Sequence, residues 1–264
     1  MASLEGVAAG MLARVERDGG TDEVAVELPL EIRLNGEPVA VTMRTPGHDL
    51  ELAAGFLYGE GIVESAPEVT LPDDLAANTV EVRAPGAAAP ANRRFYTTSS
   101  CGICGKGALE EVAVHAPRVG GGPSIARPEL AALPDRLRQP VFDRTGGLHA
   151  TGLFAGAVGE PLLVREDVGR HNAMDKVIGR ALLDGLLPLS EHVLCVSGRL
   201  GFELVQKAAR AGCPVLVGVG APTSLAVELA DDRGLTLAGF ARRGSVNVYT
   251  HPERIPLVAD GQSA

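Results

Sequence analysis

The chain has 264 residues, of which 45% are hydrophobic and 3% aromatic, with no tryptophan. This length suits one large domain or two small ones, with a core built mainly from Val, Leu and Ala. The net charge of −9 argues against a general nucleic-acid binder, because phosphate contacts need clustered Lys and Arg. No apolar run reaches the roughly 18 residues of a membrane span, and residues 1–20 lack a signal-peptide pattern. We therefore expect a cytoplasmic protein that binds neither nucleic acid nor membranes.

The N-terminal part of the sequence predicts a small β-rich domain over residues 23–120, preceded by a flexible leader, 1–22. Alternating apolar residues over 24–43 predict a hairpin, and Asn35-Gly36 is a favourable turn between its two strands. The elements expected after this hairpin are a helix over 50–58 that Asp49 caps and short strands over 78–84 and 93–100.

The glycine-rich residues 116–124 mark the boundary to a second domain, 121–256, which a tail, 257–264, follows. This domain begins with a predicted helix over 127–139 and a hairpin of two buried strands over 145–169. Apolar strands and amphipathic helices then alternate, which predicts an α/β fold with a parallel sheet and right-handed crossovers. The strands are expected over 192–198, 214–220 and 235–242, and the helices over 171–185, 202–212 and 223–234.

The most informative segment is residues 99–107, SSCGICGKG, where two cysteines lie between glycines. Cys101 and Cys104 could share a metal, form a small disulfide, or present one reactive sulfur backed by the other. Lys106 is one of three lysines in the chain, and its charge favours the thiolate form that attacks and carries sulfur. A structural zinc site needs four ligands, and neither a second CxxC nor a histidine pair supplies them. An exposed turn with incidental thiols is the competing interpretation.

Loops after the predicted strands of the second domain form another candidate site, since ligands of open α/β sheets lie beyond the carboxyl ends of the strands. Glycines at the opening of a helix present backbone N–H groups to anions, and arginines bind phosphate through two donors. Tight turns alone would also explain the glycines, so a phosphate-rich ligand is one of two interpretations. The residues concerned are Arg199, Gly218, Gly220, Thr223, Ser224, Arg242 and Arg243.

A third cluster of polar residues crowds a predicted strand-to-helix junction, where its members could be caps, surface groups or part of a site. Cys195 and Cys213 are instead predicted to be buried, apolar-behaving thiols of the core. The members of the cluster are Glu166, Asp167, Arg170, His171 and Asp175; His149 and His48 stand near other glycines.

Six segments in this order closely resemble the formate dehydrogenase accessory sulfurtransferase family, FdhD, over residues 24–255. The resemblance implies a sulfurtransferase that accepts persulfide sulfur from a cysteine desulfurase and passes it to a molybdenum or tungsten cofactor with two pterin guanine dinucleotides. Formate dehydrogenase needs that cofactor. The resemblance also implies a mixed or parallel three-layer C-terminal domain similar to the cytidine deaminase fold, although the zinc signature of those enzymes is absent. The segments are TPGHDLELAAGFLYGEGIV, SSCGICG, TGGLHATG, EDVGRHNAMDKVIG, SGRLGFELVQKAARAG and GFARRGSVNVYTHPERI.

By position, the resemblance makes Cys101 the persulfide-bearing cysteine and Cys104 its partner, with no structural metal. A guanine nucleotide such as GDP is expected to mimic the bound molybdenum cofactor, and a homodimer would suit its two nucleotide arms. The alternatives are a module that binds the cofactor without carrying sulfur, a dithiol–disulfide oxidoreductase and a metal-binding domain. The cofactor-binding residues that the resemblance implies are Phe240, Ala241, Arg242, Arg243, Gly244 and Ser245.

Overall fold

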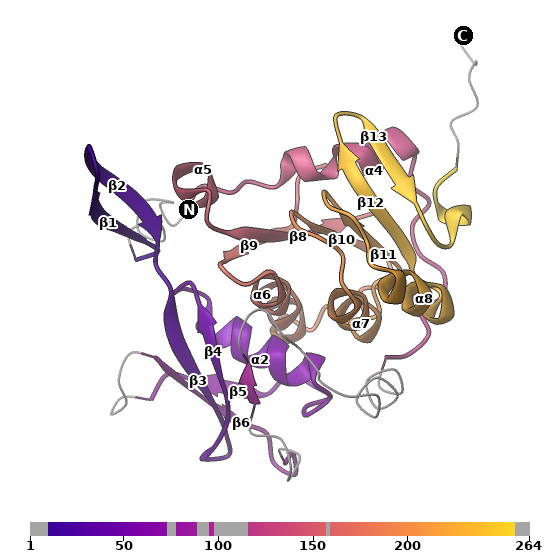
Figure 1. Ribbon diagram of the computed structural model, residues 1–264. Coiled ribbons are helices and arrows are strands. Elements are labelled where there is room, and N and C mark those ends of the chain that lie inside the picture. Colours follow the sequence, from indigo (N-terminus) through magenta and orange to yellow (C-terminus); the bar gives the residue numbers. More distant parts are fainter. Residues whose placement is uncertain (1–9, 73–77, 89–94, 98–115, 157–158, 257–264) are drawn as a thin grey trace. The chain divides into compact units, whose positions relative to one another are not determined.

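The computed structural model describes residues 10–72, 78–88, 95–97, 116–156 and 159–256 (Figure 1). The chain divides into two compact units that interleave along the sequence, whereas the sequence predicted consecutive domains with a boundary near residue 120. Unit 1 comprises Met1–Ala108, Gln139–Ala150 and Arg165–Leu186, and unit 2 comprises Leu109–Arg138, Thr151–Val164 and Leu187–Ala264.

Unit 1 contains a five-stranded sheet with the strand order β5-β6-β3-β4-β7. β3 (Leu28–Leu34) and β4 (Glu37–Arg44) form the predicted hairpin. Asn35 and Gly36 have φ angles of 52° and 88°, which the tight turn between right-twisted strands requires. β6 pairs in parallel with β3, and β7 pairs in parallel with β4. The remaining strands of this sheet are β5 (Glu68–Thr70), β6 (Thr79–Arg83) and β7 (Phe95–Thr97).

A separate two-stranded sheet lies where the sequence predicted a flexible leader. β1 (Leu12–Arg17) and β2 (Gly20–Ala25) pair antiparallel, so the leader prediction is corrected over this stretch. Gly19 and Gly20 have φ angles of 84° and 139° at the turn, which glycine adopts without a steric penalty. Most side chains of the two strands are exposed, so the hydrophobic alternation that reveals a half-buried strand is weak here.

Two helices of unit 1, α2 (Asp49–Gly59) and α6 (Arg170–Leu183), pack directly against each other. A Cβ atom on Gly55 would collide with the carbonyl oxygen of Asp175, and one on Gly179 would collide with the carbonyl oxygen of Glu51. The two backbones therefore touch, which only glycine permits. This contact assigns residues 165–186 to the same unit as the N-terminal strands, and α2 packs its apolar side chains against those strands.

The six-stranded sheet, of which unit 2 holds the greater part, has the order β13-β12-β11-β10-β8-β9. β10, β11 and β12 are parallel, as the alternating pattern predicted, while β8 pairs antiparallel with β10 and β13 pairs antiparallel with β12. The fold is therefore mixed α/β. The strands are β8 (His149–Ala155), β9 (Leu163–Asp167), β10 (His192–Val196), β11 (Val215–Gly218), β12 (Thr236–Arg242) and β13 (Ser245–Val248).

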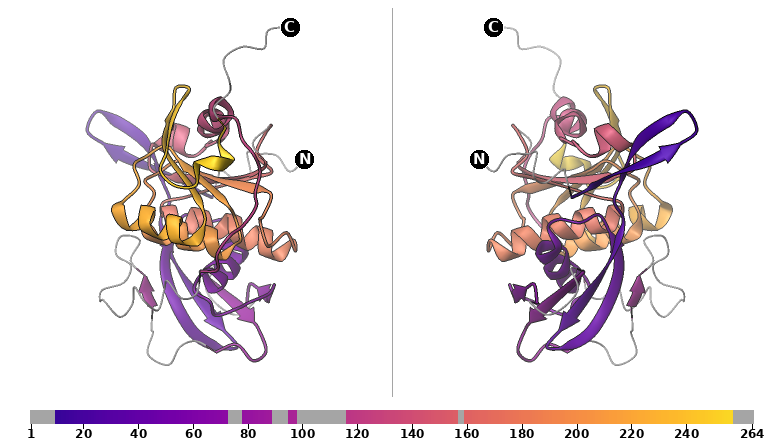
Figure 2. Two further views of the ribbon diagram at one scale, coloured as in Figure 1. Left: turned by 90° about the vertical axis from the view of Figure 1, so that its right-hand side faces the viewer. Right: turned by 90° about the vertical axis from the view of Figure 1, so that its left-hand side faces the viewer.

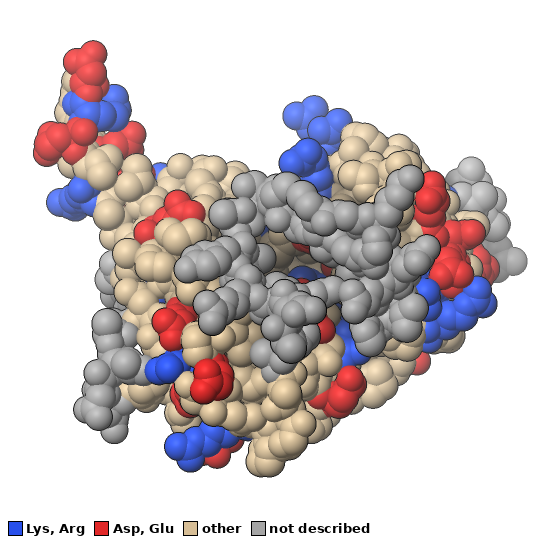
Figure 3. All heavy atoms as spheres, turned by 60° about the horizontal axis from the view of Figure 1, so that its bottom comes forward, with Lys and Arg blue, Asp and Glu red and all other residues tan. Residues whose placement is uncertain are grey.

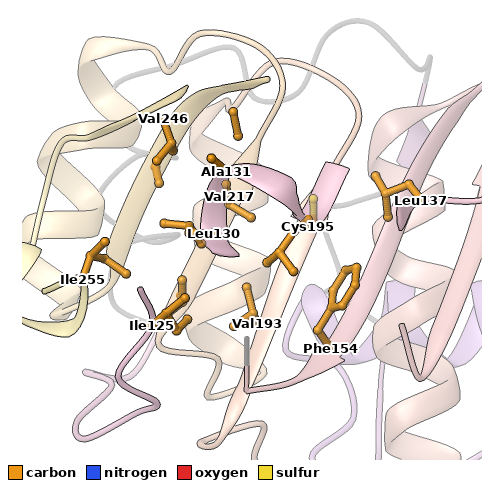
Figure 4. Close-up of a cluster of buried hydrophobic side chains, with 14 residues drawn as sticks. Ile125, Leu130, Ala131, Leu137, Phe154, Val193, Cys195, Val217, Val246 and Ile255 are labelled. Atoms are coloured by element: carbon orange, nitrogen blue, oxygen red, sulfur yellow. The ribbon is translucent and has the colours of Figure 1, made fainter. Parts of the chain in front are cut away.

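Helices cover both faces of the central strands of unit 2. Val193, Cys195 and Val217 face a buried apolar cluster together with Leu130 and Phe154 (Figure 4). Because side chains alternate along a strand, the residues between them face the opposite side, where α7 and α8 lie side by side (Figure 2). The likeness to the cytidine deaminase fold stays a prediction. The helices of this unit are α4 (Arg127–Ala132), η1 (Leu133–Arg136), α7 (Phe202–Arg210), α8 (Ser224–Arg233) and η2 (Pro252–Arg254).

The predicted helix over 127–139 is shorter than expected. It is α-helical to Ala132 and continues as the 3₁₀ turn η1, because Pro134 has no N–H with which to extend an α-helix. Residues 142–145 form a further short helix, α5 (Phe142–Thr145), in unit 1.

Candidate functional site

β7 is the last described element before the CxxC segment. Cys101, Cys104 and Lys106 lie outside the described residues, so their predicted roles stay predictions. β7 ends at Thr97, which lies opposite Thr42 in the parallel pair with β4. β7 therefore ends on the same side of the sheet as β4, where the turn 45–48 begins.

A buried ion pair fixes this turn from within unit 1. Lys176 Nζ lies 2.7 Å from Asp167 Oδ2, and neither side chain is exposed to solvent. Lys176 also donates hydrogen bonds to the carbonyl oxygens of Thr45, at 2.9 Å, and Glu166, at 3.2 Å. Asp167 in turn accepts the Thr45 N–H at 3.2 Å and the Gly169 N–H at 2.8 Å. With every polar atom of the ammonium and carboxylate engaged, this pair locks the start of the turn 45–48 in one position.

Glu166 from the predicted polar cluster has a separate structural role. Its carboxylate accepts the N–H groups of Val141, at 3.2 Å, and Phe142, at 2.8 Å, ahead of α5. Burial raises the pKa of Glu166, and these two hydrogen bonds oppose that rise only in part. The cluster that the sequence singled out thus divides. Asp167 and Glu166 anchor turns, Asp175 is buried in α6, and Arg170, His171 and His149 are half-buried.

His48 stands at the end of the turn 45–48, directly before α2. Its φ angle is 60°, in the left-handed region that few non-glycine residues adopt, and its side chain does not cap the helix. The predicted cap, Asp49, is wrong, because its carboxylate binds the Arg44 guanidinium at 2.9 Å and 3.0 Å instead. The His48 Nδ1 atom lies 3.5 Å from Glu51 Oε2.

Glu51 is held by a two-pronged contact with Arg165, whose Nε and Nη2 atoms lie 2.6 Å and 2.9 Å from the two carboxylate oxygens. Burial pulls the pKa of Glu51 upward, but hydrogen bonds from Arg165 and His48 and their positive charges outweigh burial and lower it to about 2. Glu51 is therefore ionised at neutral pH and presents a fixed negative charge to the His48 ring.

The loops after β10, β11 and β12 come together in unit 2, as predicted. The Gly220 N–H donates to the Gly198 carbonyl at 3.1 Å, and the Phe240 N–H donates to the Gly220 carbonyl at 3.1 Å. A Cβ atom on Gly220 would lie 2.9 Å from Arg199 Cα, so this glycine permits close packing of neighbouring loops. The Thr223 hydroxyl accepts the Ala226 N–H at 3.3 Å and caps α8. The Thr223 N–H also donates to the Leu200 carbonyl, at 3.0 Å. The N–H groups of Gly220 and Thr223, two members of the predicted anion cradle, are therefore taken by carbonyl groups of the protein.

An open pocket of about 420 Å³ lies beside the β12–β13 turn, in the segment that the resemblance implied. The Arg242 guanidinium carbon lies 6.0 Å from the centroid of the Phe240 ring. Ala241 points into the buried core, and Gly244, with φ 75°, shapes the turn. The lining residues are Phe240, Arg242, Arg243, Ser245 and Asn247.

Asn247 is a pocket residue that the sequence reasoning missed. It lies two residues after Ser245 on β13, and side chains two apart on a strand share a face. The alternation of side chains along a strand could have predicted Asn247, but only with the knowledge that a strand begins at Ser245.

The two cysteines in the described part of the chain are unsuited to sulfur chemistry. Cys195 and Cys213 are both fully buried, as predicted. Burial raises the pKa of the Cys195 thiol far above its usual value and that of Cys213 to about 12. Neither forms a thiolate at neutral pH, which is the nucleophilic form.

The described residues contain no group of three or more His, Cys, Asp or Glu side chains that could hold a metal ion. None of the helices in the described chain combines the length and apolarity needed to cross a bilayer. Among the side chains that Figure 3 colours by charge, acidic and basic residues are interspersed.

Comparison with solved structures gives the class of protein. The crystal structure of a proposed formate dehydrogenase accessory protein from Desulfotalea psychrophila has a TM-score of 0.71 to this chain at 28% identity, covering 93% of this chain and 97% of that one. The chain thus shares the mixed α/β fold of that accessory protein.

Sequence comparison then gives the family. The FdhD/NarQ family profile matches residues 25–256, and the chain belongs to the FdhD/NarQ family. It is 54% identical to the sulfur carrier protein FdhD of Streptomyces avermitilis, over 92% of this chain and 94% of that protein. Its identity to the protein of the same name from Sulfolobus acidocaldarius is 46%, over 91% and 94% of the two chains. The resemblance stated from the sequence motifs is confirmed.

Proposed function

We propose that this protein is a sulfur carrier that serves formate dehydrogenase. In this function Cys101 accepts sulfur from the persulfide of a cysteine desulfurase and passes it to a molybdenum or tungsten cofactor with two pterin guanine dinucleotides. The observation that carries the proposal is membership of the FdhD/NarQ family with the CxxC pair present, since relatives of about half-identical sequence bear the name sulfur carrier protein.

The chemistry requires a nucleophilic thiolate and a good leaving group. The Cys101 thiolate attacks the outer sulfur of the desulfurase persulfide, the S–S bond breaks, and the desulfurase cysteine leaves as a thiolate. Cys101 then carries the persulfide. Attack by the Cys104 thiolate on the inner sulfur releases hydrosulfide for the cofactor and leaves a Cys101–Cys104 disulfide, which a cellular dithiol must reduce before the next cycle.

The pocket beside the β12–β13 turn supports binding of the nucleotide part of the cofactor. Arg242 and Arg243 offer planar guanidinium donors suited to phosphate oxygens, and the Phe240 ring offers a face on which a base can stack. The Asn247 amide carries both donor and acceptor groups for a base edge. GDP should therefore bind as a fragment of the substrate. A homodimer, with one nucleotide arm per subunit, completes the proposal.

Mass spectrometry of the intact protein tests the sulfur-carrier function. After incubation with a cysteine desulfurase and cysteine, wild-type protein should gain the mass of one sulfur atom, and Cys101→Ala should gain none. Cys104→Ala should still be loaded, because Cys104 acts after loading. A Cys101→Ala protein that gains sulfur as wild type does would overturn the assignment.

Calorimetry with GDP tests the pocket. The Arg242→Ala/Arg243→Ala variant should lose affinity by at least about tenfold, since charge-assisted hydrogen bonds are worth roughly 1.5–3 kcal/mol each. Arg136→Ala/Arg138→Ala is the matched control, because it removes two arginines of the same unit that lie outside the pocket. Equal affinity in both variants would contradict the site. GDP binding without sulfur loading would support the alternative of a cofactor-binding chaperone.

A further inference from the structure

The hairpin of β1 and β2 has an open strand edge. β1 pairs with β2, and no other strand among the described residues adds to this two-stranded sheet. A hairpin of two strands is only marginally stable by itself in water, and an open edge is a template for pairing with another chain. The short helix α5 packs against β2, where Arg144 binds Glu23 at 2.9 Å. In the described part of unit 1, β1 therefore carries the edge that is open to a further strand.

The register of the hairpin decides which backbone groups of β1 point to this edge. The Val26 N–H donates to the Met11 carbonyl at 2.9 Å, and the strand pairing continues in the same register. Hydrogen-bonded and non-hydrogen-bonded pairs alternate along an antiparallel ladder. The odd-numbered residues of β1 therefore turn their N–H and C=O groups toward β2. Leu12, Arg14 and Glu16 turn theirs toward the open edge.

The charges along this edge are complementary to themselves. Arg14 and Glu16 stand on either side of Val15, and all three side chains are exposed, Val15 by 38%. An antiparallel pairing of two copies of β1 about a two-fold axis at Val15 places Arg14 of each copy opposite Glu16 of the other. These are the residues whose backbone groups are free to bond across the edge, and opposite charges that face each other across two strands stabilise the pair.

Other pairings of the same hairpin are disfavoured by charge. A two-fold axis at Arg14 would oppose two arginines and one at Glu16 would oppose two glutamates, and like charges directly opposite each other destabilise a sheet. The residues of β2 that lie opposite Arg14 and Glu16 are Glu23 and Thr21, so the outer edge of β2 has no basic side chain to match its acid. In the favoured register Val15 lies beside Val15 of the second copy, at a non-hydrogen-bonded position where side chains approach most closely.

We propose that the open edge of β1 binds the same edge of a second copy of this chain, in the antiparallel register centred on Val15. The two hairpins then form one continuous sheet, and each β1 becomes an inner strand. This pairing gives the homodimer of the proposed function a specific interface. It requires no sulfur chemistry, so the interface and the sulfur-carrier function can each fail without the other.

Sedimentation equilibrium of the full-length protein over a range of concentrations tests the interface by charge reversal. Arg14→Glu and Glu16→Arg should each raise the dissociation constant of the dimer by at least about tenfold, because each change turns both opposite-charge pairs into like-charge pairs. The double variant Arg14→Glu/Glu16→Arg should associate as wild type does, since its pairs are opposite in charge again. Arg138→Glu, which reverses an exposed arginine of unit 2, is the matched control and should change nothing.

Mixing the two single variants gives the sharpest result. Arg14→Glu presents two acids along the edge and Glu16→Arg presents two bases, so an equimolar mixture should form mixed dimers although neither variant pairs with itself. A fluorescent label on one variant detects them. Recovery in the mixture or in the double variant shows that the single variants fail through charge and not through misfolding. Wild-type protein that stays monomeric, single variants that associate as wild type does, or a mixture without mixed dimers would each overturn the proposal.

Discussion

In unit 2 the central strands and α4 bury a cluster that is almost wholly apolar (Figure 4), whereas in unit 1 a buried ion pair lies between the turn 45–48 and α6. Apolar contacts are non-directional, so the core of unit 2 supports a scaffold whose loops carry the pocket. Hydrogen-bonded charges fit only one arrangement, and Lys176 and Asp167 fix the turn that carries His48. The difference teaches that unit 1 adds a buried charge pair, which fixes one turn, to an apolar core of its own. The cluster of unit 2 relies on apolar area alone.

The sharpest way to break this comparison is to remove one charge of the pair. Lys176→Met should lower the free energy of unfolding by about 3–5 kcal/mol, because Asp167 then stays buried without a counter-charge. Urea denaturation followed by circular dichroism measures this loss. The double variant Lys176→Met/Asp167→Asn should recover a large part of it, since the second change removes the unpaired charge. A single variant as stable as wild type would show that the pair does not organise unit 1.

The contact between α2 and α6 tests whether unit 1 depends on equally exact packing. Gly179→Ala should cost about 3 kcal/mol, because the added methyl group meets the Glu51 carbonyl and the helices must separate. The midpoint of urea unfolding measures the effect. Gly120→Ala is the control, since nothing lies within 4 Å of the methyl group that it adds. Equal midpoints for the two variants would contradict the contact.

The contribution of Glu51 to the free energy of unfolding should depend on pH. Its pKa is lowered to about 2 from 4.5, so its contribution to stability is complete above pH 4.5 and is lost as the pH falls toward 2. Wild type should exceed Glu51→Gln in free energy of unfolding by on the order of 2 kcal/mol at neutral pH. Unfolding curves at several pH values should show this gap closing between pH 4.5 and 2. A gap that is independent of pH would rule out the ionised carboxylate as its source.

The smallest effect is expected in the apolar core of unit 2. Cys195→Ala should cost only about 1 kcal/mol, because it removes one sulfur atom from a cluster that can partly close around the space. Cys195→Ser should cost more, since the structure offers an apolar surrounding to a hydroxyl that needs a hydrogen bond. Thermal unfolding of the two variants ranks them. A serine variant more stable than the alanine variant would refute the apolar character of this position.

Local sequence patterns predicted most of the helices and strands. Asn35-Gly36 specifies its turn by backbone preference alone, and the alternation of apolar strands with helices over residues 192–242 predicts the three parallel strands that β10, β11 and β12 form. The hairpin β1–β2 was not predicted, because most of the side chains on its strands are exposed. The interleaved division into units was not predicted, because the helix contact at Gly55 and Gly179 joins segments that no local sequence pattern connects.

The site was predictable in its residue types and less so in its contacts. Resemblance pointed to residues 240–245, four of which line a pocket, and the period of a strand would have added Asn247. The binding role of these residues stays a prediction. The structural role of Lys176 was not predicted, since its partners Asp167 and Thr45 come together only in the folded chain. The anion-binding role predicted for Gly220 does not use its N–H, because that group donates to a carbonyl of the neighbouring loop, a partner that the sequence does not reveal.

The interleaved order of the two units constrains how the protein is made. Unit 1 needs α6, whose last residue is Leu183, before α2 can bury its glycine face. Unit 1, to which the CxxC segment belongs, therefore cannot be completed until more than two thirds of the chain has left the ribosome. A nascent chain that ends at residue 120 cannot close its first unit, so a chaperone that shields exposed apolar strands during translation should raise the yield of active protein.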